Sequence, residues 1–93
     1  MKTVGKIKID DVMELVKLVS RVHMETEHYA EIQISNFGHN VSVWAMEGGF
    51  DSSRKFSFNE DLNLYDPYDQ EGDADTYRKI REYLKSLLGE NNG

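Results

Sequence analysis

Cysteine is absent from the 93 residues, proline occurs once, and no long apolar run is present. The lack of cysteine excludes disulfides, thiolate zinc sites and cysteine nucleophiles, and suits a reducing compartment. No stretch approaches the roughly 18 apolar residues of a membrane-spanning helix. The lysine-containing start lacks the apolar region of a secretory signal. We therefore expect a cytoplasmic chain with a single domain over residues 1–93, since this length supports one small core.

Basic residues are missing from one long segment. The net charge is −6, yet residues 56–77 contain seven acids and no Lys or Arg, so the rest of the chain is close to neutral. Within that segment, Tyr65–Asp75 carries five acids and the only proline. The acidity is thus a local feature, and three explanations are open for it: a metal site, a surface for a basic partner, or a solvated loop.

Two segments have the apolar spacing of amphipathic helices. The first covers about residues 11–25, with Asp10 as its N-cap. Its apolar positions are Val12, Leu15, Val16, Val19 and Val22. The second is the last helix, which Asp73 or Asp75 would cap and Gly89 would end. Its apolar positions are Tyr77, Ile80, Leu84, Leu87 and Leu88.

Between the helices the apolar period changes to two, which predicts strands at about 28–35, 41–47 and 54–59. The turns fall at 36–40 and 48–53, and a loop with little periodicity follows from about Glu60 to Gly72. Phe56 and Phe58 would share one face of the third strand. Short connections favour an antiparallel meander.

The predicted fold is therefore α+β. Its element order is α-β-β-β-α, with a three-stranded antiparallel meander sheet and two helices packed on one face. Residues 1–9 would form an extended lead-in, and residues 90–93 a frayed tail.

Known motifs do not explain the acidic segment. The element order resembles that of double-stranded-RNA-binding domains, but "GDADTYRK" has acids where that family has phosphate-binding lysines, which argues against direct nucleic-acid binding. An EF-hand loop starting at Asp69 would have Ala74 at its glycine position and Ile80 at its glutamate position. The histidines have no metal-ligand spacing, and no nucleophile or phosphate-loop motif is present. We expect no metal, no cofactor and no enzymatic activity.

The candidate partner-binding residues are acids and aromatics. They are Trp44, Glu60, Asp61, Tyr65, Asp66, Tyr68, Asp69, Glu71, Asp73 and Asp75. An extended chain rises about 3.3 Å per residue, so alternate acids from Asp69 to Asp75 would lie about 6.6 Å apart, the order of spacing of successive phosphates. Trp44, on the strand face opposite Val41 and Val43, either covers the edge of the core or anchors an interface. The acids either bind a basic cleft or only meet water and cap the last helix.

The segment "DLNLYDPYDQEGDAD", together with the short, acidic, cysteine-free chain and its αβββα order, is similar to small phage-encoded anti-CRISPR proteins. The resemblance implies an inhibitor that mimics DNA and occupies the basic nucleic-acid cleft of a host nuclease such as a CRISPR effector. The protein would then act in the cytoplasm of the host cell. The alternative is a small homo-oligomeric interaction protein that associates through the sheet face around Trp44.

Overall fold

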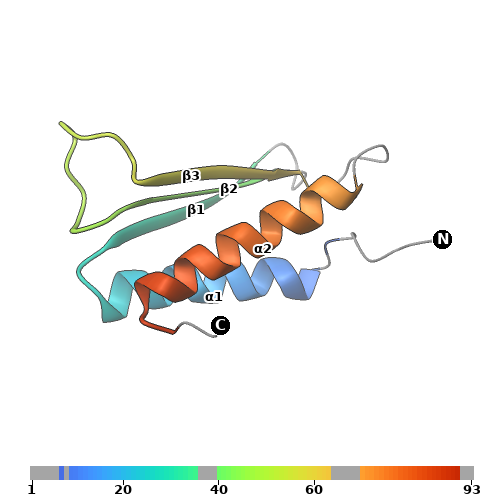
Figure 1. The fold of residues 1–93 in the computed structure, drawn as a ribbon, viewed down its shortest axis with the longest axis horizontal. Helices are drawn as coiled ribbons and strands as arrows, with labels where there is room; N and C mark the ends of the chain where they lie inside the picture. Colours follow the sequence, from blue (N-terminus) through green and yellow to red (C-terminus); the bar gives the residue numbers. More distant parts are fainter. Residues whose placement is uncertain (1–6, 8, 36–39, 64–69, 91–93) are drawn as a thin grey trace.

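The computed structural model describes residues 7, 9–35, 40–63 and 70–90. These residues form, in chain order, α1 (Ile9–Glu25), β1 (Tyr29–Ser35), β2 (Asn40–Met46), β3 (Phe58–Asn63) and α2 (Gln70–Leu87). The strands make an antiparallel sheet in the order β1-β2-β3, and both helices cover the same face of it (Figure 1). The predicted α+β fold, α-β-β-β-α with a three-stranded meander, is confirmed.

The two helices run in the same direction across the sheet, so both N-termini lie at one end of the molecule (Figure 1). α1 packs against β1, α2 packs against β3, and the helices contact each other. The register places Ile32 opposite Val43 in the first strand pair and Ala45 opposite Phe58 in the second.

The core lies between the sheet and the helices. Val41, Val43 and Ala45 of β2 point into it and are fully buried, as the alternation predicts. The helices contribute apolar stripes, and the fully buried members include Leu15, Val22, Ile80 and Leu84. In α1 the buried stripe includes Leu18, while Val16 is only half-buried. The stripe is therefore turned toward α2 relative to the predicted one.

The third strand was predicted four residues too early. It is Phe58–Asn63 rather than 54–59, and the predicted loop from Glu60 to Gly72 is wrong at both ends because β3 reaches Asn63 and α2 begins at Gln70. Phe56 precedes β3 and contacts Trp44, whereas Phe58 stacks on Tyr83 of α2, so the two phenylalanines do not share a face. The strand can be recognised from Phe58 and Leu62, which are apolar and lie between polar neighbours.

The helix starts also differ from the predictions. α1 begins at Ile9, which places Asp10 in its first turn rather than at the N-cap and shortens the expected 1–9 lead-in. α2 begins at Gln70, so Asp73 and Asp75 lie inside it and neither caps it. Acids in the first turns favour the helix because its N-terminus carries a partial positive charge.

The end of α2 is tied to the rest of the fold. Gly89 adopts a φ of 79°, its N–H donates to the Ser86 carbonyl over 3.0 Å, and the Glu90 N–H donates to the Lys85 carbonyl over 2.8 Å. These two bonds form a Schellman motif, which confirms Gly89 as the residue that ends the helix. The Glu90 carboxylate then pairs with Arg21 of α1 at 2.6 Å. The expected frayed tail is therefore wrong at Glu90, and residues 91–93 lie outside the described residues.

Candidate interaction surface

The sheet face that the helices do not cover, here called the open face, carries the alternate residues of each strand. Its described members are Tyr29, Glu31, Gln33, Asn40, Ser42, Trp44, Met46, Asn59 and Asp61, and of these Met46 alone is buried. The described strands contain three acids, Glu31, Glu60 and Asp61, and no Lys or Arg. The open face is consequently acidic and amide-rich.

Glu60 and Asp61, which the sequence places side by side, point to opposite faces of β3. Asp61 lies on the open face and accepts a hydrogen bond from the Ser42 hydroxyl over 2.7 Å. Glu60 points toward the helices and pairs with Lys79 of α2 at 2.7 Å. Only Asp61 therefore shares a face with Trp44.

The predicted extended row of carboxylates is not present from residue 70 onward. Gln70–Leu87 is helical, and a helix rises about 1.5 Å per residue with successive side chains about 100° apart. The alternating spacing of an extended chain is therefore replaced by helical spacing from Glu71 to Asp75. The Asp75 side chain is 74% exposed and pairs with Arg78 at 3.0 Å. Four candidates, Tyr65, Asp66, Tyr68 and Asp69, lie outside the described residues.

Four aromatic residues gather at the open face and form what we call the aromatic patch: Tyr29, Trp44, Phe50 and Phe56. Trp44 is half-buried, and its ring centroid lies 6.0 Å from that of Phe56. Tyr29 meets Phe50 edge to face at 5.2 Å. The Tyr29 hydroxyl donates to Glu31, and this hydrogen bond raises the pKa of Tyr29. The 60% exposure of Phe50 leaves the patch open to solvent.

The connection between β2 and β3 holds the two phenylalanines in place. Gly48 and Gly49 have φ angles of 86° and 111°, values that favour glycine. The Asp51 carboxylate accepts hydrogen bonds from the Ser53 N–H at 2.9 Å and hydroxyl at 2.7 Å, which lower the pKa of Asp51. Arg54 donates to the Gly49 carbonyl over 2.8 Å.

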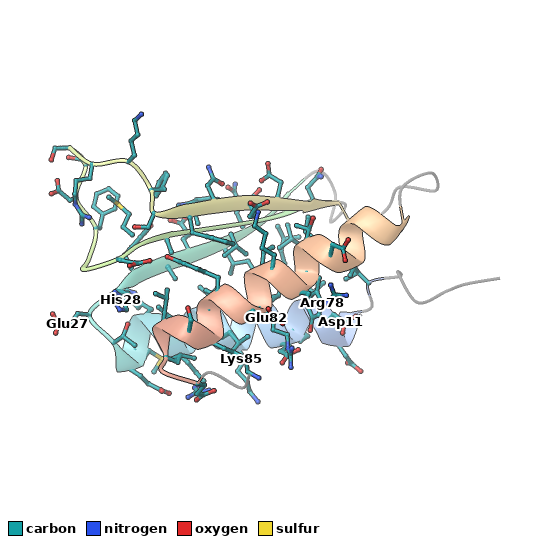
Figure 2. All side chains as sticks on the ribbon, in the orientation of Figure 1. Asp11, Glu27, His28, Arg78, Glu82 and Lys85 are labelled. Atoms are coloured by element: carbon teal, nitrogen blue, oxygen red, sulfur yellow. The ribbon has the colours of Figure 1, made fainter. Side chains whose placement is uncertain are left out.

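His28 fastens this connection to the turn between α1 and β1. Its Nδ1 accepts a hydrogen bond from the Gly48 N–H over 2.9 Å, and its own N–H donates to the Thr26 hydroxyl (Figure 2). The sequence pattern predicts only a turn here. The two glycines and the Asp-Ser-Ser run were the available signal for an ordered connection.

The polar contacts between the helices have a structural explanation. Glu14 of α1 accepts hydrogen bonds from the Tyr77 hydroxyl and from Arg81, the latter over 3.1 Å. The bond from Tyr77, followed by the Arg81 interactions, lowers the pKa of Glu14 despite partial burial. Burial and Glu14 raise the pKa of Tyr77. These groups satisfy one another and join α1 to α2.

Within the described residues, no group of three or more His, Asp or Glu side chains is arranged to hold a metal ion. Neither described helix combines the length and apolar character needed to cross a membrane. No protein-family model matches the chain, and neither a curated protein nor a solved structure matches it.

Proposed function

We propose that this protein is an inhibitor that binds a basic protein and occupies the nucleic-acid cleft of a host nuclease such as a CRISPR effector. One observation carries the proposal: the open face presents Glu31 and Asp61, and no Lys or Arg of the described strands, on the same side of the sheet as Trp44. Negative charge beside a half-buried aromatic anchor suits a cleft whose arginines and lysines bind phosphates.

The acidic surface would continue around the β3 edge onto α2. Because α2 packs against β3, Asp61 on the open face, Glu60 on the opposite face and the first turns of α2 belong to one side of the molecule. Glu60 and Asp75 are already paired with Lys79 and Arg78, but such exposed pairs contribute only about 0–1 kcal/mol. A partner's arginine can therefore replace these lysine and arginine partners at small cost.

Charge and aromatic residues would have separate effects on binding. The acids would attract a basic partner over a distance comparable to the screening length, about 8 Å at physiological salt, and so accelerate association. The aromatic patch would slow dissociation, because buried aromatic side chains dominate the energy of most interfaces. Removal of the acids would thus lower the association rate, and removal of Trp44 would raise the dissociation rate.

The test is competition between this protein and duplex DNA for a purified RNA-guided nuclease. The variant Asp61→Asn/Asp75→Asn removes two charges from the proposed surface. The matched control, Glu27→Gln/Glu82→Gln, removes two exposed charges elsewhere (Figure 2). We expect the half-inhibitory concentration to rise about tenfold for the first variant and much less for the control.

Equal effects of both variants would contradict a localised acidic surface, and unchanged DNA binding at any concentration would contradict inhibition. Trp44→Ser provides a further comparison, with chain mass measured by light scattering. If it dissociates a homo-oligomer and no nuclease is inhibited, the aromatic patch is a self-association surface instead.

A further inference from the structure

The outer edge of β1 is a surface that the proposed function does not use. β1 is the first strand of the sheet, and among the described residues only β2 pairs with it. An edge strand presents unpaired backbone N–H and C=O groups, and proteins usually protect such edges with Lys, Pro or a bulge. The β1 sequence YAEIQIS contains neither Lys nor Pro, and it pairs with β2 without a break in register.

The residue order of β1 is complementary to itself. An antiparallel pair of β1 strands related by a two-fold axis at Ile32 would align all seven residues of Tyr29–Ser35. Glu31 would then lie opposite Gln33 of the second copy, and Ala30 opposite Ile34 of the second copy. Placing the axis at Glu31 would instead put two carboxylates directly opposite each other, which is unfavourable. Ile34, which is 51% exposed, would gain an apolar neighbour.

α1 continues its apolar surface on the side that adjoins this edge. Glu14 and Arg21 point toward α2 and its C-terminal end, so residues on the other flank of α1 point away from α2. Because α1 packs against β1, that flank lies beside the outer edge of the strand. Its members, spaced three and four residues apart, are Val12, Val16, Val19 and His23. Val16 is only half-buried and His23 is exposed.

We propose that the chain forms a two-fold symmetric dimer through the β1 edge, with a continuous six-stranded sheet and all helices on one face. The two α1 helices would lie antiparallel on either side of the axis, with the flank that carries Val16 and His23 turned toward the second copy. An isologous contact of this kind is the commonest form of homo-oligomer. The open faces of both copies stay uncovered and lie next to each other, so this inference stands independently of the proposed function.

The test measures mass by light scattering over a range of protein concentrations. We expect a concentration-dependent rise from the 10.8 kDa chain mass to twice that value. Gln33→Glu places a carboxylate opposite Glu31 of the second copy, twice per dimer, on an exposed position. It should raise the dimer dissociation constant about tenfold, since like charges directly opposite each other destabilise paired strands.

The exchange variant Glu31→Gln/Gln33→Glu restores an acid opposite an amide and should restore the dimer relative to Gln33→Glu. His23→Glu should weaken the dimer through α1, while Glu82→Gln, on α2, should leave it unchanged. The proposal is overturned by a monomer at every concentration up to about 0.5 mM, which would place any dissociation constant above that of even weak specific complexes. A dimer that Gln33→Glu leaves intact would also overturn it.

Discussion

The two faces of the sheet differ in almost every property although they belong to the same three strands. The helix-facing side carries Val41, Val43 and Leu62, each with no solvent exposure. The open face carries amides, a hydroxyl, two acids and the half-buried Trp44. Apolar burial at roughly 25 cal/mol per Å² makes the first side the main source of stability. The second side is under little constraint from folding, and its composition is free to serve a partner.

The largest effect should come from the helix-facing side. Leu84 is fully buried, and Leu84→Ala removes its contacts and leaves a cavity. We expect the free energy of unfolding to fall by about 2–5 kcal/mol. The control is Gln33→Ala on the open face, which should change it by no more than about 0.5 kcal/mol. Chemical denaturation measures the free energy of unfolding of both variants. Similar losses in the two would contradict the helix-facing side as the main source of stability.

Two glycines with positive φ angles lie just beyond the ends of regular elements. Gly89 ends α2, and Gly48 lies in the connection that holds the aromatic patch. Replacement of either by alanine should cost about 1–2 kcal/mol, because a Cβ is unfavourable in this conformation. Only Gly48→Ala should change the fluorescence of Trp44, the single tryptophan, and a change in Gly89→Ala instead would contradict the separate packing of the two sites.

Acid should weaken the contact between the helices. The pKa of Glu14 is lowered in the folded protein by the hydrogen bond from Tyr77 and by Arg81. This contribution to stability is therefore complete above the ordinary carboxyl value of 4.5 and is lost as the pH falls through the lowered pKa. Glu14→Gln should reduce the loss of stability between pH 5 and about pH 3 in thermal unfolding. An unchanged pH profile in this variant would contradict a role for Glu14.

The smallest effect on folding should come from Asp61→Asn. Its partner is the exposed Ser42 hydroxyl, and an amide oxygen also accepts that hydrogen bond. We expect the melting temperature to stay nearly constant, as for most exposed substitutions, while inhibition of the nuclease weakens. A large drop in melting temperature would assign Asp61 to the structure and remove it from the proposed surface.

Periodicity predicts those elements in which local pattern and burial agree. The valines of β2 alternate over the whole strand, and the apolar spacing of both helices is regular, so these elements and the element order follow from the sequence. The third strand was misplaced because Glu60 points toward the helices. Its charge is compensated by Lys79, which is 19 residues away and invisible to a local pattern. The start of α2 was missed because Gln70–Asp75 offers acids rather than an apolar stripe.

The candidate surface was only partly predictable for a similar reason. Alternation alone predicts that Trp44 and the valines of β2 point to opposite faces of the sheet, and the structure confirms it. The location of Asp61 on the same face as Trp44 depends on the β2–β3 register, which pairs Ser42 with Asp61. The return of Phe50 and Phe56 to this face depends on hydrogen bonds within the connection. Both are tertiary facts that a sequence pattern does not contain.

The most direct test of the proposed function is the salt dependence of inhibition. Nuclease cleavage of a duplex target is measured with and without this protein at 50 and 300 mM salt, at matched enzyme activity. An acidic surface in a basic cleft predicts inhibition at low salt that falls by about tenfold or more in affinity at high salt. Strong inhibition with no dependence on salt, or no inhibition at 50 mM, would contradict the account.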